Sequence, residues 1–185
     1  MLILASGSPR RREILTTAGI PFRLAAPGIE EEPEPGESAE SYVRRLARDK
    51  ARALSCGEGD IILAADTVVT IDGQILEKPR DAADARRMLG LLSGRRHEVI
   101  TGVCLRTALR ELVAHECTAV HFVAMSEREI DEYVASGEPL DKAGAYGIQG
   151  LASKFIDRIE GCYFNVVGLP VALVYRLLKE LWPPE

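Results

Sequence analysis

Apolar and polar residues follow two different periods along the chain, and these periods predict a mixture of strands and helices. Apolar runs of strand type occur at residues 2–5, 60–71, 97–107, 111–124 and 155–159. Apolar residues at helical spacing occur at residues 9–18, 38–56, 81–92, from 126 onward, and at 169–181. Because strands and helices interleave, we predict an α/β fold with a mixed sheet.

Short polar signals mark several ends of these elements. Asp72-Gly73 predicts a tight turn, with a return strand at residues 74–76. Ser126, with Glu129 three residues later, has the pattern of a capping box at a helix N-terminus. The acidic segment 28–40 contains two prolines and is typical of a loop. No composition change marks a linker, so we expect residues 1–185 to form a single domain.

The start of the chain combines a strand with a turn rich in hydroxyl groups and cations. The run Leu2 to Ala5 leads into Ser6-Gly7-Ser8-Pro9 and then into Arg10, Arg11 and Arg12. Ser8 followed by Pro9 predicts the N-cap and first position of a helix. Cations at this end of a helix are unfavourable, because the end already carries partial positive charge. A bound anion would explain them, and backbone N–H groups, hydroxyls and guanidinium groups together suit phosphate.

Lys50 occupies an unusual position for a charged side chain. It lies four residues after Leu46 and four before Leu54, on the apolar face of the predicted helix. One interpretation is a lysine whose stem covers apolar surface while its ammonium group reaches water. The other is a lysine directed into a cleft toward phosphate. The spacing alone does not separate them.

Asp66 places a carboxylate directly after the buried run Ile61 to Ala65. A lone aspartate after a strand is commonly a turn or helix cap. Here Thr67 leads back into the apolar pair Val68-Val69, so Asp66 interrupts a strand instead of ending one. This position favours a charge that faces a cleft over a cap, since ligands of α/β proteins collect at strand ends.

The segment Asp141 to Gly150 is dense in glycine, which lets a backbone approach another group closely. It matches neither GxxxxGK[ST] nor GxGxxG, so neither a P-loop nor a dinucleotide fingerprint is predicted. One interpretation is a structural loop. The other is a binding loop in which the Gln149 amide, both donor and acceptor, contacts a base edge. Lys78, which Pro79 biases toward an extended conformation, is a weaker signal.

Composition narrows the classes of function. With a formal net charge of −5, we expect no general nucleic-acid binding, which normally needs a basic protein. The cysteines form no CxxC pair and the histidines lie in predicted strands without a third ligand, which argues against zinc. The absence of GxSxG argues against a Ser-His-Asp hydrolase. Scattered thiols, no signal peptide and no long apolar run lead us to expect a cytoplasmic protein without membrane association.

Taken together, these segments resemble the Maf family of nucleoside triphosphate pyrophosphatases. The resemblance covers nearly the whole chain and is carried by Ala5 to Arg11, Ala65 to Thr67, Glu77 to Pro79, Leu92 to Gly94 with His97, Thr101 to Val103, Asp141 to Gly150 and Gly161 to Pro170. It implies an elongated mixed sheet with flanking helices in two lobes around a deep cleft, similar to inosine triphosphate pyrophosphatases. It also implies hydrolysis of the α–β phosphate bond of nucleoside triphosphates with a divalent metal ion, Mg, Mn or Co.

The same resemblance assigns roles to single residues. The catalytic set that it implies is Ser6, Arg11, Lys50, Asp66 and Lys78, with Asp66 as the proton acceptor. The branch of the family that acts on dTTP and UTP has Arg, Thr and Gln at three specificity positions, which are here Arg10, Thr67 and Gln149. The branch that prefers 7-methyl-GTP differs at all three. A homodimer is expected from the resemblance alone.

The charges of these residues suit such a substrate. A triphosphate carries about four negative charges near neutral pH, so it requires several cations and usually Mg²⁺. Asp66 either activates water directly or holds a metal ion that does so. Glu31 is a candidate second carboxylate for that metal, and the alternative is a solvated loop charge. Because successive helical residues point about 100° apart, the three arginines cannot all face one ligand. The resemblance implies Arg11 at phosphate and Arg10 in substrate choice, and we expect Arg12 in solvent.

Two hypotheses of different classes follow. The first is a dTTP/UTP pyrophosphatase, which would extend to modified pyrimidine nucleotides and control the nucleotide pool. The second is a nucleotide-binding regulator of cell division without significant turnover, since the family name comes from an effect on septum formation. A regulator needs the phosphate pocket but does not need Asp66 beside it.

Overall fold

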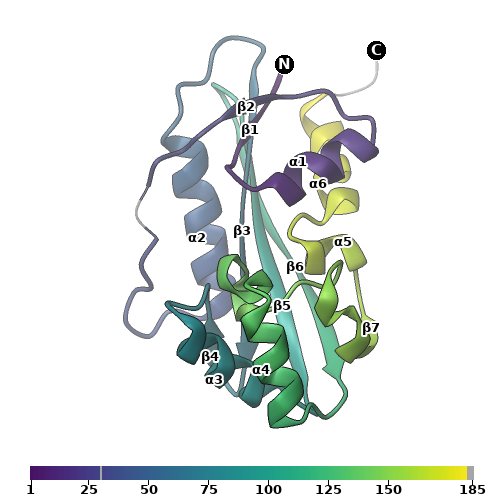
Figure 1. Ribbon diagram of the computed structural model, residues 1–185. Helices are drawn as coiled ribbons and strands as arrows, with labels where there is room; N and C mark the ends of the chain where they lie inside the picture. Colours follow the sequence, from purple (N-terminus) through teal and green to yellow (C-terminus); the bar gives the residue numbers. More distant parts are fainter. Residues whose placement is uncertain (30, 183–185) are drawn as a thin grey trace. The chain divides into compact units, whose positions relative to one another are not determined.

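The computed structural model describes residues 1–29 and 31–182, and Glu30 of the acidic segment lies outside the described residues. The described strands are β1 (Leu2–Ala5), β2 (Arg23–Ala25), β3 (Ile61–Ile71), β4 (Gln74–Leu76), β5 (Arg96–Arg106), β6 (Glu111–Phe122) and β7 (Ile156–Glu160). They form a seven-stranded sheet in the order β2-β1-β3-β5-β6-β7, with β4 paired to β3 (Figure 1). β1 is parallel to β2 and β3, whereas β4 and β7 are antiparallel to their partners. The predicted α/β fold with a mixed sheet is confirmed.

The predicted helices are present, with some different ends. The α-helices of the described residues are α1 (Pro9–Thr17), α2 (Ala39–Arg52), α3 (Ala82–Leu92), α4 (Glu127–Ala135), α5 (Tyr163–Val167) and α6 (Val171–Leu181). The capping box of Ser126 and Glu129 is formed at the start of α4. Within the described residues, every helix is too short or too polar to span a lipid bilayer.

The structure differs from the sequence prediction at one helix end and at several short elements, among them the unpredicted three-residue strand β2. α2 ends at Arg52 instead of near residue 56, and the side chain of Arg106 donates to the carbonyls of Ala51 and Leu54 beyond the last turn. The glycine-rich region contains the 3-10 helices η1 (Glu138–Asp141), η2 (Ala143–Ala145) and η3 (Leu151–Phe155). These helices and α5 were not predicted, because so few residues carry too little periodicity to detect.

The chain folds into two compact units. The first unit consists of residues 1–66, 101–116 and 168–185, and the second consists of residues 67–100 and 117–167. Strands β3, β5 and β6 each contribute residues to both units. In the first unit, α2 lies on one side of β1 and β3, and α1 and α6 lie on the other (Figure 1).

The first unit brings α2 unusually close to the sheet. A buried cluster of small side chains lies between them and includes Ala5, Ala47, Ala51, Ala64 and Cys104. Gly102 of β5 faces the backbone of α2, and a Cβ atom at this position would lie 2.2 Å from the Val43 carbonyl oxygen. The helix and the sheet therefore meet at a distance that only residues without a bulky side chain allow.

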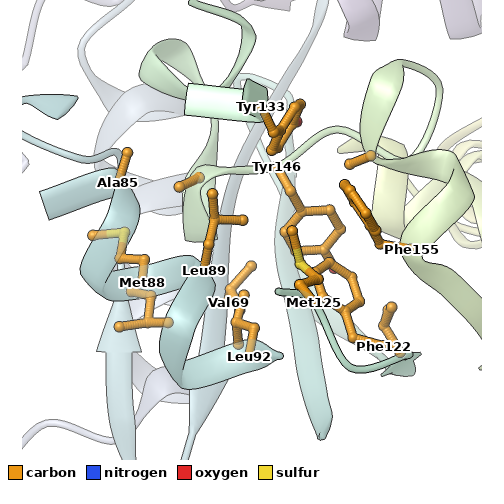
Figure 2. Packing of buried hydrophobic residues seen from close by; sticks show 14 of the residues in the cluster. Val69, Ala85, Met88, Leu89, Leu92, Phe122, Met125, Tyr133, Tyr146 and Phe155 are labelled. Atoms are coloured by element: carbon orange, nitrogen blue, oxygen red, sulfur yellow. The ribbon is translucent and has the colours of Figure 1, made fainter. Parts of the chain in front are cut away.

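The second unit has its own apolar core, which Figure 2 shows. Side chains of α3, such as Met88 and Leu89, pack there with aromatic residues that include Tyr133 and Phe155. His97, Phe122 and Tyr146 meet edge to face, with ring centroids 4.8–5.4 Å apart. His97 Nε2 lies 2.8 Å from the Tyr146 hydroxyl oxygen, which gives this buried imidazole a polar partner.

Replacement of Gly102 by alanine tests the close contact between α2 and β5. We expect Gly102→Ala to lower the free energy of unfolding by about 2–4 kcal/mol, because the new Cβ overlaps the α2 backbone. Gly90→Ala in α3 is the matched control, since no atom lies within 4 Å of a Cβ there, and it should raise stability by about 0.5–1 kcal/mol. Urea unfolding of both variants measures the difference, and equal effects would contradict the close contact.

The buried imidazole predicts a dependence of stability on pH. Burial lowers the pKa of His97 from 6.5 to about 4, so the unfolded chain binds a proton between these values that the folded chain does not. We expect the free energy of unfolding to fall by up to about 3 kcal/mol as pH drops through this window. Urea unfolding at a series of pH values between 7 and 4 gives the free energy of unfolding at each pH. This free energy should fall less steeply with decreasing pH in His97→Gln than in the wild type. An equally steep fall in both would exclude His97 as the cause.

Candidate functional site

The turn after β1 is organised by Ser6. Helix α1 begins at Pro9 with Ser8 in the N-cap position, as predicted, but the Ser8 side chain makes no capping hydrogen bond. Instead, the buried Ser6 hydroxyl accepts hydrogen bonds from the Ser8 backbone N–H at 3.1 Å and from Arg11 Nη1 at 3.3 Å. Ser6 therefore fixes the turn and reaches the guanidinium group at the same time.

Arg11 connects three segments of the first unit. Its Nη1 donates to the Ala65 carbonyl and its Nε donates to the Gly168 carbonyl, both at 2.8 Å. Burial lowers the pKa of Arg11 from its ordinary value, while the nearby carboxylates of Asp66 and Glu31 act in the opposite direction. An arginine side chain stays charged in proteins, so the turn presents a fixed cation beside Asp66. Arg12 is exposed, as predicted.

Lys50 and Asp66 form a buried ion pair. Lys50 Nζ lies 2.6 Å from Asp66 Oδ1, and each residue is 6% exposed. Asp66 lies inside β3 and not at its end, as the sequence indicated. The ammonium group is covered, so the interpretation of Lys50 as a lysine that reaches water is wrong.

Glu31 is a second carboxylate on the same ammonium group. Its Oε1 lies 2.9 Å from Lys50 Nζ, although the side chain is 46% exposed. The Glu31 carboxylate is therefore paired with a buried cation on one side and open to water on the other, which differs from a fully solvated loop charge.

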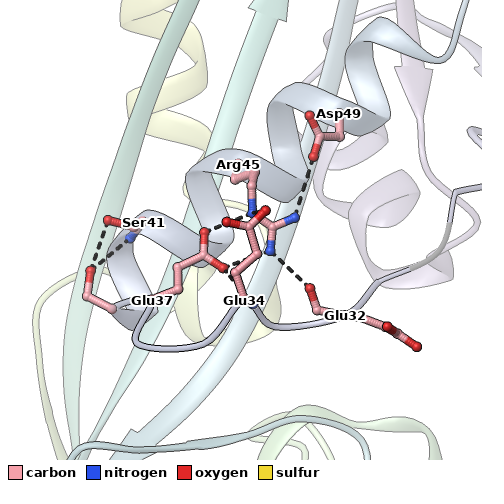
Figure 3. A network of polar contacts seen from close by, with 7 residues as sticks. Glu32, Glu34, Glu37, Ser41, Arg45 and Asp49 are labelled. Carbon is pink, nitrogen blue, oxygen red and sulfur yellow. Dashed lines mark hydrogen bonds and ion pairs between the residues drawn. The ribbon is translucent and has the colours of Figure 1, made fainter.

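The segment that carries Glu31 is held against α2 by Arg45 (Figure 3). Arg45 donates to both carboxylate oxygens of Glu37, at 2.8 and 2.7 Å, and to the Glu32 carbonyl at 3.0 Å. Its guanidinium group also lies 3.6 Å from carboxylate oxygens of Glu34 and Asp49. The hydrogen bonds from Arg45 lower the pKa of Glu37 and those to Glu37 raise the pKa of Arg45. This network anchors the acidic segment five residues before Lys50 on the same helix.

The other predicted residues have different positions. Arg10 is half-buried and precedes Arg11 on α1. Thr67 follows Asp66 in β3, Lys78 is exposed after β4, and Gln149 is exposed in the turn before η3; all three belong to the second unit. Within the first unit, the structure brings together Ser6, Arg11, Glu31, Lys50 and Asp66.

Two carboxylates fit a small divalent cation of the type that the sequence implies. Among the described residues, no group of three or more His, Cys, Asp and Glu side chains is placed to hold a metal ion. Mg²⁺ is commonly held by one or two carboxylates, with water and substrate phosphates as the remaining ligands. Asp66 and Glu31, which converge on one cationic group, match that ligand set.

Comparison with known proteins identifies the family. The family model described as Maf-like protein matches residues 1–181. The chain belongs to the Maf family. A dTTP/UTP pyrophosphatase of Koribacter versatilis is 51% identical over 97% of this chain and 93% of its own. The dTTP/UTP pyrophosphatases of Symbiobacterium thermophilum and Salmonella typhimurium are each 52% identical, over 99% and 97% of this chain and 95% and 92% of their own.

Solved structures show the same fold for this Maf protein. The Ham1 protein of Staphylococcus aureus has a TM-score of 0.52 and that of Coxiella burnetii a TM-score of 0.53. Each is 15% identical, and the match covers 97% of this chain and 98% of the other. At this identity the likeness concerns the fold alone.

Sequence reasoning missed the groups that support the predicted residues. Arg11 contacts backbone carbonyls of Ala65 and Gly168, and a carbonyl group has no signature in a sequence. Arg45 is one of several arginines on α2, and its spacing does not distinguish it from Arg44 or Arg48. The one available signal was that Arg45 follows an acidic segment, which is too general to identify its partners.

The contacts of Arg11 predict a structural effect that its neighbour lacks. We expect Arg11→Gln to lower the free energy of unfolding by about 1–3 kcal/mol, because two carbonyl groups of buried residues each lose a hydrogen bond from the guanidinium group. Arg12→Gln, the same change one residue later on an exposed side chain, should stay within about 0.5 kcal/mol. Urea unfolding compares them, and similar losses in both variants would contradict the bridging role.

Proposed function

We propose that this Maf protein is a dTTP/UTP pyrophosphatase, which hydrolyses the α–β phosphoanhydride bond to give the nucleoside monophosphate and pyrophosphate. The names of relatives at 51–52% identity over nearly the full chain support this proposal. The observation that carries it is the buried pair of Lys50 and Asp66 with Arg11 and Glu31 beside it, since it combines carboxylates and fixed cations in one place.

The charges of the first unit suit the reaction. Asp66 is the proton acceptor for the attacking water, and it would also be a ligand of the metal ion when that ion is bound. Lys50 and Arg11 stabilise negative charge that develops on the phosphoryl oxygens. Ser6 holds the Arg11 guanidinium group and adds a hydroxyl at the helix N-terminus. Lys78 supplies a further cation for the polyphosphate.

The metal ion belongs to this proposal. Asp66 and Glu31 would hold Mg²⁺, Mn²⁺ or Co²⁺, which would neutralise phosphate charge when bound. The Lys50 ammonium group, in contact with both carboxylates, offsets part of their negative charge. Arg45 keeps Glu31 near Asp66 through its hydrogen bonds to Glu32 and Glu37, which follow Glu31 in the acidic segment.

Substrate choice is assigned to three residues. Arg10, Thr67 and Gln149 match the dTTP/UTP branch at each specificity position. We infer that they select thymine and uracil bases, including modified pyrimidine nucleotides, and that the reaction controls the nucleotide pool. A cytoplasmic homodimer without nucleic-acid binding is part of the same proposal.

Asp66→Asn tests the catalytic assignment. We expect pyrophosphate release from dTTP and UTP to fall by about 10²–10⁴-fold, because the amide cannot accept the proton. Asp60→Asn is the matched control, since Asp60 precedes the same strand and pairs with the N-terminal amine at 3.4 Å. Pyrophosphate is measured as phosphate after added inorganic pyrophosphatase, and circular dichroism verifies folding. Near-normal turnover by folded Asp66→Asn would exclude this role.

A panel of nucleoside triphosphates tests the function itself. The wild-type protein is incubated with each triphosphate and Mg²⁺, Mn²⁺, Co²⁺ or EDTA, and chromatography identifies the products. Monophosphate and pyrophosphate from dTTP and UTP, with a requirement for metal, is the expected result. Binding without product from any nucleotide would contradict the enzyme and favour the regulator of cell division.

A further inference from the structure

The turn that carries Gln149 is held by side chains from outside it. Gly150 N donates to the Gly147 carbonyl at 3.1 Å, which closes a four-residue turn with Gln149 exposed near its tip. A turn of this kind on a surface is mobile unless its backbone has further partners. The second unit provides such partners on both sides of the turn.

Tyr133 and Glu138 bind the two ends of this turn. The Tyr133 hydroxyl accepts a hydrogen bond from Gly147 N at 3.2 Å, and Glu138 Oε2 accepts one from Leu151 N at 3.0 Å. The same hydroxyl donates to Glu138 Oε1 at 2.9 Å, so the two side chains are also connected to each other. Tyr133 comes from α4 and Glu138 from η1, both outside the turn.

Tyr133 and Glu138, which together we call the clamp, are held in place by burial and close packing. Tyr133 is 3% exposed, and its ring packs in the apolar core near Phe155 (Figure 2). A Cβ atom at Gly150 would lie 2.4 Å from both Glu138 carboxylate oxygens. One at Gly147 would lie 2.7 Å from Lys142 Cε. Gly150 therefore leaves the space that the Glu138 carboxylate occupies, and Gly147 leaves the space of the neighbouring Lys142 side chain.

We propose that Tyr133 and Glu138 are positioning residues for base selection: they fix the backbone of the Gln149 turn and so limit the places from which its amide can reach the base. This inference rests on the proposed function, because it requires that Gln149 faces the base. Neither side chain needs to touch the substrate. Their contribution is to remove the freedom of the turn before the nucleotide arrives.

The chemistry of the bases explains why a fixed turn matters. Uracil and thymine present an N3–H donor beside an O4 acceptor, whereas cytosine presents an N3 acceptor beside an N4 donor. An amide complements either edge if it can rotate or shift, because it carries one acceptor and one donor group. A fixed Gln149 backbone limits how far the amide can shift, so the placement that suits the N3–H donor and O4 acceptor of UTP is favoured over the one that suits CTP.

Tyr133→Phe removes the hydroxyl and keeps the buried ring. We expect the ratio of kcat/KM for UTP to that for CTP to fall about tenfold, since one clamping group holds each end of the turn. Glu138→Gln should lower the same ratio, because one amide oxygen cannot replace two carboxylate acceptors. Gly150→Ala should do so as well, by displacing the Glu138 carboxylate.

Tyr146→Phe is the matched control. It also removes a buried tyrosine hydroxyl from this core, but that hydroxyl contacts His97 and not the turn. A lower midpoint of thermal unfolding with an unchanged UTP to CTP ratio is expected. If Tyr146→Phe lowers the UTP to CTP ratio as much as Tyr133→Phe does, the effect comes from a general loosening of the core. The positioning role of Tyr133 is then wrong.

The outcomes separate this inference from the proposed function. If the UTP to CTP ratio of kcat/KM is unchanged in folded Tyr133→Phe and Glu138→Gln but changed in Gln149→Ala, the positioning role of Tyr133 and Glu138 is wrong. The proposed pyrophosphatase activity is not affected by this result. An unchanged ratio in Gln149→Ala overturns the role of the turn in base selection, again without affecting pyrophosphate release. If wild-type protein releases no pyrophosphate from any triphosphate, the proposed function itself is wrong.

Discussion

A buried ion pair between Lys50 and Asp66 is the constraint on which the first unit depends. Both groups are almost fully removed from water, and loss of one member of such a pair typically costs about 3–5 kcal/mol, because the other is left charged and unpaired. The pair therefore demands close registration of α2 and β3. Glu31 adds a second carboxylate from the solvent side, so that one ammonium group joins a helix, a strand and a loop.

The reach of a lysine side chain sets how near α2 must come to the sheet. Gly102 and a series of alanines provide that approach, since any larger side chain at the contact would push the helix away. Val43, which faces Gly102, lies two helical turns before Lys50 on α2. Small side chains between α2 and the sheet thus allow the close approach in which Lys50 contacts Asp66. The packing of the first unit and its candidate site therefore depend on the same contact between helix and sheet.

The two units use the same kind of contact at their candidate functional segments. Arg11 donates to carbonyls of Ala65 and Gly168, and the pair Tyr133 and Glu138 accepts from the N–H groups of Gly147 and Leu151. In each case, side chains make hydrogen bonds to backbone groups of another segment. Such contacts fix a turn or a strand interior without adding regular structure, which keeps Ser6 and Gln149 at defined positions.

The order of strands and helices, the hairpin at Asp72-Gly73 and the capping box at Ser126 follow from the sequence, because they depend on neighbours within a few residues. The same local pattern placed Lys50 and Asp66 at apolar positions and indicated an anion site at the turn after Ser6, and resemblance supplied the individual catalytic and specificity roles. Only the tertiary structure decided that Lys50 contacts Asp66 and Glu31, and that α2 ends at Arg52. It alone identified Arg45, Tyr133 and Glu138 as supports. These contacts depend on how elements pack in space, which no local period of the sequence specifies.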